Sequence, residues 1–496
     1  MITEFYKNSE IFITGGSGVL GKAAIEKLLR SCDVKKIYVL IRSKKNSSPE
    51  ERLSEMKNSK IFKVLRGLKP DEMDKKLIAI PGDITQDCLG ISEEYKLMMA
   101  NVTIFIHLAA STRFNLSLRT AIEANLKSTQ KALKLAESFK NLKIFLYVST
   151  FYSNPDVVHI EDKVYPAIFD WKTAMNLLNS EHDQMEPVFH AIESKLIQDF
   201  PNTYVFTKHL AEQLVNDYRH KLPVAIFRPS IVTAAFQEPE PGYTESMTGV
   251  MGLLSIWGTG LIQVLLCNPK LILDLTPLDA STKFLLIFTA KSAKLERKSI
   301  LEKTPVGMFS SWGILRHPFG EFGKFLSAIS RENPLEKSIW IPHVTMTTSS
   351  VVYWVYLFCL QLFPAFIIDV FLKLFGQKPI MMAIQRKIYF ASDALRFFIS
   401  NQFASDGATD FKELLVSTKG TEFDINYLDG CCRDDKYMRE VLELQMKGCR
   451  KFLLKEDESS LPRCRNIFKV KMFVYNVIRA YVIYVVGKFI YRSVMN

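Results

Sequence analysis

Between residues 10 and 230 the chain alternates short apolar runs with longer segments of helical periodicity. Continuous apolar runs of this length are typical of strands buried on both faces, as in a parallel sheet. The runs are IFITGG (11–16), KIYVLIR (36–42), LIAIPGDI (77–84), VTIFIHLAA (102–110), KIFLYVST (143–150) and VAIFRPSIV (224–232). The repeated strand–helix pattern predicts an α/β fold with an N-terminal doubly wound parallel sheet of the Rossmann type.

The pattern changes along the rest of the chain. Residues 151–203 are rich in Pro and acidic residues and are expected to form an insertion on the substrate side. Residues 351–368 contain no charge, which is the low end of the length of a membrane span, and a long buried hairpin element fits them equally well. We predict four consecutive segments: a Rossmann reductase domain (1–290), a connecting segment (291–345), a mainly helical C-terminal domain (346–465) and an apolar tail with basic flanks (466–496).

The tail carries Lys and Arg at both ends, with Arg479 and Lys488 inside the apolar stretch. A cation at the centre of a bilayer costs about 3 kcal/mol on insertion scales. The tail is therefore expected to lie in or dip into the membrane interface, with its basic side chains reaching toward the surface, rather than to span the bilayer.

Composition narrows the classes of partner. The net charge of +12 fits nucleic acid, anionic lipid or a polyanionic cofactor, but no zinc finger, basic zipper or RNP-like run is present, so nucleic acid is not expected. None of the eight cysteines forms a CxxC pair, which predicts neither a metal site nor a disulfide scaffold. The first residues show no signal-peptide pattern, so an intracellular protein is expected.

The residues after the first predicted strand have the spacing of a dinucleotide-binding loop. Gly15 permits a tight turn, Gly18 lets the backbone approach a pyrophosphate, and Gly21 allows close helix–strand packing. An ordinary strand–helix turn is the alternative, and the position on the first strand favours the cofactor. The residues expected to contact the cofactor here are Thr14, Gly15, Ser17, Gly18, Val19, Leu20 and Gly21.

The ends of the next three strands suggest which cofactor is bound. The second strand ends in Arg42 and Lys44 rather than an acidic residue, which suits the 2′-phosphate of NADPH, although a solvated basic loop has the same pattern. Asp83 is placed either to accept from the adenine amine or to make a local turn hydrogen bond. Further cofactor contacts are expected from Ile84 at the end of the third strand and from Leu108 and Ala109 at the end of the fourth.

Tyr204 and Lys208 have the spacing of a catalytic pair. Four residues apart on a helix, they share one face, and a nearby ammonium is expected to lower the pKa of the phenol. Lys208 is also placed to reach the nicotinamide ribose. Ser149 and Thr150 end the fifth predicted strand, where one hydroxyl would polarise a carbonyl; the sequence does not separate the two.

The motifs TGGSGVLG, PGDI, HLAAS, VSTFYSN, NTYVFTK and FRPSIV, in this order, resemble an extended short-chain dehydrogenase/reductase. More closely, the chain resembles the alcohol-forming fatty acyl-CoA reductases of insects and other eukaryotes. WIP, LFPAFIIDV, FGQKPIMM and GCRKFLLKEDESSLP resemble the C-terminal "sterile" domain of that family, so the resemblance covers nearly the whole chain.

The resemblance implies NADPH-dependent reduction of a long-chain or very-long-chain fatty acyl-CoA, through an aldehyde, to a primary alcohol. It matches Gly15, Gly18 and Gly21 to the cofactor loop, Tyr204 and Lys208 to the catalytic pair, and 149–150 to the Ser/Thr position. An intracellular membrane (endoplasmic reticulum, peroxisome or lipid droplet) is expected, with the catalytic domain facing the cytosol. The alternatives are another membrane-bound extended reductase, of the sterol or sugar-nucleotide type, and a weakly catalytic Rossmann scaffold.

Overall fold

The computed structural model groups the chain into two compact units, each assembled from three stretches of sequence. Unit 1 comprises Met1–Tyr243, Asp274–Arg316 and Phe403–Cys432, and unit 2 comprises Thr244–Leu273, His317–Gln402 and Arg433–Asn496. The structure describes residues 2–44, 47–179, 193, 195–197, 199–247, 249–311, 317–405, 413, 415–431 and 435–495. Part of the insertion expected at 151–203 therefore lies outside the described residues.

Unit 1 is built on a seven-stranded sheet in which every described pairing is parallel. In spatial order the strands are β3 (Leu77–Pro81), β2 (Lys36–Ile41), β1 (Glu10–Thr14), β4 (Ile104–His107), β5 (Ile144–Val148), β7 (Val224–Pro229) and β11 (Val306–Phe309). The six strands predicted from apolar runs and the Rossmann-type sheet are confirmed. The strand order reverses at β1, and ligands of such folds bind at the carboxyl ends of the strands beside this point.

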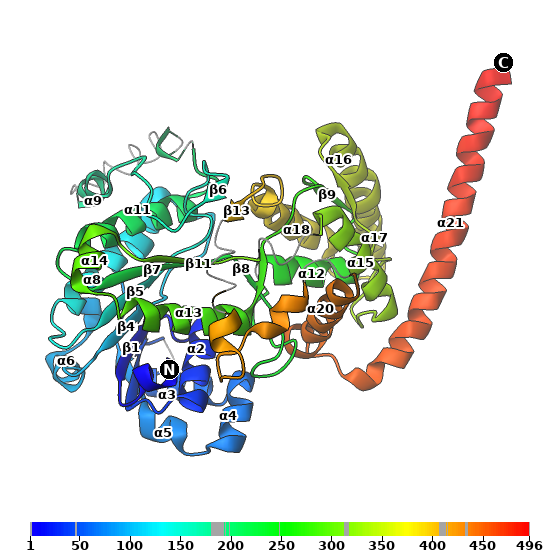
Figure 1. Cartoon of the computed structure of the whole chain (residues 1–496). Coiled ribbons are helices and arrows are strands. Elements are labelled where there is room, and N and C mark those ends of the chain that lie inside the picture. Colours follow the sequence, from blue (N-terminus) through cyan, green and yellow to red (C-terminus); the bar gives the residue numbers. More distant parts are fainter. Residues whose placement is uncertain are drawn as a thin grey trace. The chain divides into compact units, whose positions relative to one another are not determined.

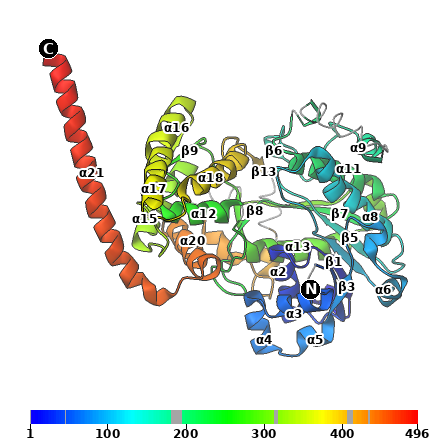
Figure 2. The ribbon, with the colours of Figure 1, turned by 180° about the vertical axis from the view of Figure 1, so that it is seen from behind.

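Helices cover both faces of the sheet (Figures 1 and 2). On one face α2 (Val19–Ser31) packs against α13 (Leu278–Ser292), and on the other α8 (Ser128–Ala136) packs against α11 (Thr203–Tyr218). The remaining helices of unit 1 include α1 (Ile2–Tyr6), α3 (Pro49–Lys57), α4 (Lys63–Leu68), α5 (Glu72–Lys76), α6 (Glu93–Met98), α7 (Leu118–Ala121), α9 (Trp171–Asn179) and α14 (Arg297–Glu302). Two short parallel pairs complete it: β8 (Ile231–Thr233) with β10 (Leu275–Pro277), and β6 (His159–Ile160) with β13 (Ala404–Ser405).

Unit 2 is mainly helical, as predicted for the C-terminal part of the chain. Its helices include α12 (Gly249–Thr259), α15 (Phe319–Glu332), α16 (Ser350–Leu357), α17 (Phe363–Leu374), α18 (Met381–Arg396), α20 (Asp435–Gly448) and α21 (Leu461–Met495), with one strand pair, β9 (Val264–Leu266) and β12 (Thr345–Thr347). The core lies where α12 meets α15 and α20. There the buried Trp257 donates its indole N–H to Ser327 Oγ at 3.0 Å.

The two apolar stretches of the second half are both helical. The π-helical turn η4 (Phe358–Leu362) joins α16 to α17, so that residues 350–374 form one helix of 25 residues, whose most apolar 18-residue window has a mean hydropathy of 2.1. Only 17% of its most apolar window is buried, so the expectation of a buried hairpin element is wrong. Within the described part of the chain, this is the one helix long and apolar enough to cross a membrane. Residues 466–495 of the expected tail belong to α21, red in Figure 1.

The units divide the chain differently from the four consecutive segments predicted from composition. Residues 244–273 belong to unit 2 although they lie within the predicted reductase domain, and 403–432 belong to unit 1. Strand β11, which completes the sheet, comes from the segment predicted to be a connection. The boundaries at 290, 345 and 465 describe consecutive sequence segments and remain predictions. The units differ from these segments because strands and helices pack with partners that lie far away in the sequence.

Candidate active site

The loop between β1 and α2 has glycines where no other residue fits. Gly15 has a φ of +73°, and a Cβ there would lie 2.6 Å from the backbone nitrogen of Ala109. A Cβ on Gly21 would lie 2.5 Å from the carbonyl oxygen of Gly15. These close approaches bring the start of α2 against the ends of β1 and β4, which is the packing that a dinucleotide-binding loop requires.

The first turn of α2 has the properties of an anion site. Its N-cap residue, Gly18, offers no side-chain hydrogen bond, and Ser17 and Gly18 are exposed. Val19 and Leu20, half-buried, form the first helical residues. The backbone N–H groups at the start of this 13-residue helix and its dipole suit a pyrophosphate, so the loop fits the cofactor inferred from the sequence.

A neutral histidine connects this loop with the neighbouring strand. The backbone N–H of Leu108 donates to the carbonyl of Thr14 at 3.1 Å, and Thr14 Oγ1 forms a 2.7 Å hydrogen bond with His107 Nδ1. On the other side of the ring, Nε2 lies 3.3 Å from Thr129 Oγ1. Burial lowers the pKa of His107 to about 3, so the ring stays uncharged. Only the small residues of HLAA (107–110) stood out in the sequence, and the link that His107 makes between Thr14 and Thr129 was not predicted from it.

Arg42 and Lys44 follow β2, and both are exposed. Arg42 lies 3.5 Å from Asp83 Oδ2, and Asp83 also accepts from the Thr85 backbone N–H at 2.9 Å and from its hydroxyl at 2.8 Å. Burial opposes ionisation of Asp83, but these hydrogen bonds and the charge of Arg42 lower its pKa. Asp83 thus makes the local turn hydrogen bond that the sequence left open, and Ile84 beside it is half-buried.

Tyr204 stands in the first turn of α11. This helix begins where Asn202 Oδ1 accepts from the Val205 backbone N–H at 2.9 Å. The hydroxyl of Thr150 lies near the phenol of Tyr204 and acts to lower its pKa, whereas the buried hydroxyl of Ser149 lies near Glu212 and helps to keep its pKa low. The structure therefore distinguishes the two hydroxyls that the sequence did not separate: Thr150 is the one beside the phenol.

Lys208 lies one turn further along the same face of α11 and is buried. Its ammonium donates to the carbonyl of Val148 at 2.6 Å and lies 4.3 Å from the centre of the Tyr147 ring. Burial lowers the pKa of Lys208 to about 7, against the opposing effect of the Glu212 charge. Burial also raises the pKa of Tyr204 to about 12, although the nearby hydroxyl of Thr150 works in the other direction.

The pKa of Tyr204 is thus raised, where the spacing of Tyr204 and Lys208 led us to expect it to fall. Desolvation of the phenol outweighs the effect of its neighbours, and Lys208 is itself desolvated. A tyrosine in this state is protonated at neutral pH. It is suited to donate a hydrogen bond or a proton, which is the role that a reduction needs.

Glu212 continues the same face of α11 and forms a buried ion pair with Arg228 of β7. Arg228 donates through Nε to Glu212 Oε1 at 2.9 Å and through its second guanidinium nitrogen to Oε2 at 2.6 Å. Ser153 Oγ adds a donor to Oε1 at 2.8 Å. Burial opposes the charge of Glu212, but Arg228 outweighs it and the pKa is lowered. A fixed negative charge therefore stands one turn from Lys208, and sequence reasoning missed it.

Asn125 is a second residue that sequence reasoning missed. It lies in the π-helical turn η3 (Ile122–Lys127) between α7 and α8. Its amide accepts from the Ser111 backbone N–H at 2.8 Å and donates to Thr207 Oγ1 of α11 at 3.0 Å. Asn125 thus fixes the loop after β4 to the helix that carries Tyr204 and Lys208. No sequence motif singled out Asn125, and the π-helical turn that contains it is seen only in the structure.

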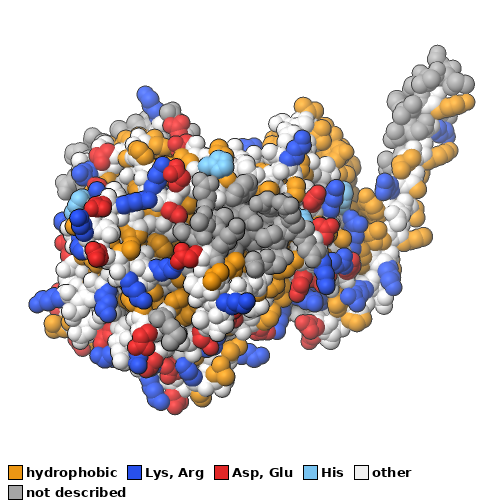
Figure 3. All heavy atoms as spheres, viewed as in Figure 1, with side chains coloured by type: hydrophobic (Ala, Val, Ile, Leu, Met, Phe, Trp, Pro, Cys, Tyr) orange, Lys and Arg blue, Asp and Glu red, His pale blue; other side chains and the backbone are white. Residues whose placement is uncertain are grey.

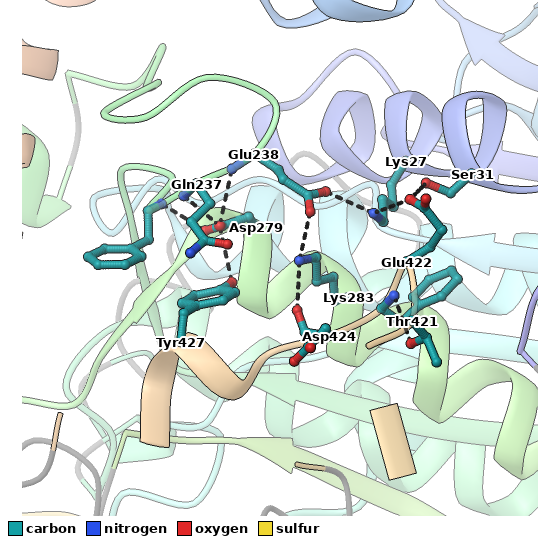
Figure 4. Close-up of polar contacts among 12 residues, drawn as sticks. Lys27, Ser31, Gln237, Glu238, Asp279, Lys283, Thr421, Glu422, Asp424 and Tyr427 are labelled. Carbon is teal, nitrogen blue, oxygen red and sulfur yellow. Dashed lines mark hydrogen bonds and ion pairs between the residues drawn. The ribbon is translucent and has the colours of Figure 1, made fainter. Parts of the chain in front are cut away.

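The far end of α2 is held by a cluster of buried charges (Figure 4). Lys27 of α2 donates to Glu238 Oε2 at 2.8 Å, and Lys283 of α13 donates to Oε1 at 2.8 Å. Burial opposes the charge of Glu238, but the two ammonium groups lower its pKa to about 2. The helix that begins at the cofactor loop is in this way tied to the loop that follows β8.

The same loop is fixed by Asp279, which accepts from the backbone N–H groups of 236, 237 and 238 at 2.8, 2.8 and 3.2 Å. Tyr427 donates its hydroxyl to Asp279 Oδ2 at 3.1 Å, and Lys283 donates to the carbonyl of Asp424 at 2.8 Å. Residues 424–427, far away in the sequence, are therefore part of unit 1 and stabilise it beside α13 (Figure 4).

Comparisons with known proteins show the family of this chain. The NAD-binding family model described as male sterility protein matches residues 13–285, and the Sterile model, with the same description, matches residues 360–456. Fatty acyl-CoA reductase 1 of Mus musculus is 33% identical over 505 aligned residues, covering 100% of this chain and 94% of its own. The chain belongs to the fatty acyl-CoA reductase family. The resemblance stated from the motifs is thereby confirmed.

Other relatives extend this agreement. Fatty acyl-CoA reductase 2 of Bos taurus is 31% identical over 95% of this chain and 89% of its own, and a Drosophila melanogaster protein with the same family name is 30% identical over 95% and 90%. As a member of this family, the present protein is an oxidoreductase that uses a nicotinamide cofactor. The fold is also that of the terminal reductase domain of the myxalamid biosynthetic pathway, with a TM-score of 0.57 and 17% identity over 89% of this chain and 90% of that one.

Proposed function

We propose that the protein reduces a long-chain or very-long-chain fatty acyl-CoA to a primary alcohol through an aldehyde, and that it uses NADPH. One observation carries the assignment of the catalytic residues. Thr150 contacts the protonated Tyr204, and Lys208 lies one turn away on the same helix face, at the edge of the sheet where the glycine loop opens. The substrate class follows from the family, whose named members are fatty acyl-CoA reductases.

The chemistry needs two reductions. When bound, the nicotinamide supplies a hydride to the carbonyl carbon of the thioester and, from a second molecule, to that of the aldehyde. The hydroxyls of Thr150 and Tyr204 donate hydrogen bonds to the oxygen as it becomes an oxyanion. Collapse of the first oxyanion breaks the C–S bond and releases the CoA thiolate. In the second reduction Tyr204 transfers its proton to the alkoxide, which completes the alcohol.

NADPH is favoured over NADH by the two cations after β2. Arg42 and Lys44 are exposed, and the guanidinium of Arg42, 3.5 Å from Asp83 Oδ2, has further N–H groups for a phosphate. The end of β2 carries no acidic residue that would accept from a 2′-hydroxyl. Asp83 and Ile84 are assigned to the adenine side, Asp83 through Oδ2 because Oδ1 accepts the local hydrogen bonds from Thr85. Leu108 and Ala109 are assigned to the strand edge beneath the cofactor, and Lys208 to the nicotinamide ribose as well as to Tyr204.

The protein is further proposed to act at an intracellular membrane, of the endoplasmic reticulum, peroxisome or lipid droplet, with its catalytic unit facing the cytosol. The tail supports attachment, because apolar side chains of α21 such as Phe473, Tyr481 and Tyr484 are exposed between basic residues. Each Lys or Arg near an anionic surface contributes about 1 kcal/mol of attraction. The substrate and cofactor are both available on the cytosolic side.

The test is turnover of the purified full chain with NADPH and a panel of acyl-CoAs of increasing chain length. Alcohol and aldehyde are quantified by mass spectrometry, and two NADPH should be consumed for each alcohol. The same panel with NADH tests the cofactor. Failure to reduce any acyl-CoA, in a preparation that still binds NADPH, would overturn the proposal.

A further inference from the structure

The helix formed by residues 350–374 has two contrasting sides. A narrow stripe at four-residue intervals is turned into unit 2 and consists of Tyr353, Leu357, Gln361, Ala365 and Asp369. The opposite side is apolar and open: Trp354, Phe358, Phe363, Phe366 and Phe371 are each 52–59% exposed. Figure 3 shows hydrophobic side chains gathered over the region where Figure 1 labels α16. An exposed apolar surface of this kind marks an interaction site.

The two polar residues that interrupt the apolar run both point inward and are bonded to unit 2. Gln361 Oε1 accepts from the backbone N–H groups of Gln263 at 2.9 Å and Val264 at 3.1 Å, and its amide donates to Gln385 at 3.1 Å. Asp369 accepts from the backbone N–H groups of residues 380, 381 and 382, at 2.8, 2.8 and 2.9 Å, at the start of α18. The exposed side of the helix therefore carries no charge between residues 351 and 372.

Most of the charges beside this side are positive, and the exposed acid Asp393 near Tyr353 is paired with Arg396 at 3.3 Å. Asp369 is the only acidic residue between 337 and 392, and it is turned inward. Lys373 and Lys378, near the C-terminal end of the helix, are exposed, and so are Arg386 and Lys387, which follow the Gln385 that bonds to Gln361 at the middle of the helix. An apolar face bordered mainly by cations is complementary to a bilayer with anionic headgroups, where the face enters the acyl boundary and the cations meet the phosphates.

We propose that the exposed side of helix 350–374 lies within one leaflet of an anionic membrane, in the plane of the membrane rather than across it. A span would pull Gln361 and Asp369 away from their hydrogen bonds and into hydrocarbon, which is costly. Immersion of one side leaves these bonds intact. The inference deepens the membrane attachment proposed above and rests on it: it adds a contact, independent of the tail, that orients unit 2 against the surface.

Cys359 provides a probe at the centre of this face, because its thiol is exposed. The experiment uses the full chain with Cys431 and Cys432 replaced by Ser and a nitrobenzoxadiazole label on Cys359 in a Cys88→Ser background. The matched control carries the label on Cys88, which is exposed in unit 1, in a Cys359→Ser background. Both are added to phosphatidylcholine vesicles with and without phosphatidylserine.

The label on Cys359 should shift to shorter wavelength on anionic vesicles and be quenched by shallow rather than deep nitroxide lipids, while the label on Cys88 stays unchanged. A Cys359 label that does not respond in vesicle-bound protein would overturn the inference but leave attachment by the tail standing. Quenching at mid-bilayer depth would overturn the in-plane arrangement. A shift that depends on protein concentration without vesicles would identify a second copy as the occupant, and would also overturn it.

Substitution gives a second readout. Phe363→Glu with Phe366→Glu should weaken binding of the full chain to anionic vesicles by about tenfold or more. Leu97→Glu, at a 76% exposed apolar position of unit 1, should leave binding unchanged. Reduction of a water-soluble short-chain acyl-CoA should be the same in all three proteins, which separates this inference from the proposed reaction. Equal vesicle binding by the double variant and wild type would overturn it.

Discussion

Unit 1 around α11 and unit 2 around α16–α17 break the usual rule of hydrophobic burial in opposite directions. In unit 1, Lys208, Glu212 and Arg228 are charged residues that are completely or almost completely buried. In unit 2, large aromatic residues such as Phe363 and Phe366 are more than half exposed. The first region places polar groups in the core, and the second places apolar groups outside it.

The two regions differ in where their side chains find interaction partners. The buried charges find partners within the protein, at 2.6 Å between Arg228 and Glu212 and at 2.6 Å between Lys208 and the carbonyl of Val148. Burial of charge without a partner costs several kcal/mol, so such pairs hold side chains in one position. The exposed aromatic residues are satisfied only by a partner outside the protein. Unit 1 is thus organised for chemistry and the face of unit 2 for contact.

The largest effect is expected at Tyr204. Tyr204→Phe should lower kcat for alcohol formation by about 10²–10⁴-fold, because it removes the proton donor. NADPH binding, followed by fluorescence titration, should stay near the wild-type value, since the loop at β1 is untouched. Near-normal turnover in this variant would remove Tyr204 from the mechanism and make the polar interior of unit 1 purely structural.

Breaking the buried pair should come next in size. Glu212→Gln leaves the buried Arg228 charged and without its carboxylate partner, which should lower the free energy of unfolding by about 3–5 kcal/mol. Asp71→Asn is the matched control, since the Lys75–Asp71 pair is exposed by 68% and 75%, and it should cost less than about 1 kcal/mol. Chemical denaturation of both variants measures the difference. Equal losses would show that burial does not distinguish the pairs.

Cofactor preference should respond to Arg42. Arg42→Asp should reduce the ratio of kcat/KM for NADPH over NADH by about 10–100-fold, because a charge-assisted hydrogen bond contributes about 1.5–3 kcal/mol. Lys75→Asp, a charge change on exposed α5, serves as the control. If the ratio is the same in wild type and Arg42→Asp, the bases after β2 form only a solvated loop.

The pH dependence of kcat/KM reports ionisation of the free enzyme. With a pKa of about 7, Lys208 loses its ammonium charge as the pH rises through neutrality, so kcat/KM should fall above about pH 7. Lys208→Arg keeps a charge at all these pH values and should abolish this decline, even if its activity is lower. A decline of unchanged midpoint in the Arg variant would assign it to another group.

The smallest effect is expected on the outer face of unit 2. Phe363→Ser, at a position 52% exposed, should change the free energy of unfolding by less than about 0.5 kcal/mol. Phe105→Ala in the sheet, where the ring is fully buried, should cost about 3–5 kcal/mol. Denaturation in the absence of lipid makes the measurement. A large loss from Phe363→Ser would mean that the aromatic face supports the protein fold itself.

The local secondary structure and the glycine loop of this protein could be predicted from its sequence. Six of the seven sheet strands, the glycine loop and the helix that carries Tyr204 and Lys208 were predictable because each depends on neighbours within about ten residues. Apolar runs, helical spacing and glycine positions are patterns of this range. Strand β11 was missed because four residues, VGMF, carry too little pattern outside the sheet that buries them.

The tertiary structure alone decided how distant residues meet. Arg228 on strand β7 meets Glu212 on helix α11, Asn125 reaches Thr207 across 82 residues, and residues 424–427 join α13. Burial also set the charge states, since it raises the pKa of Tyr204 and lowers that of Lys208. The same holds for helix 350–374: its composition allowed a span or a buried hairpin, and only the direction in which Gln361 and Asp369 point showed which side is left open. Desolvation and pairing depend on the whole assembled environment, and no segment of sequence contains that environment by itself.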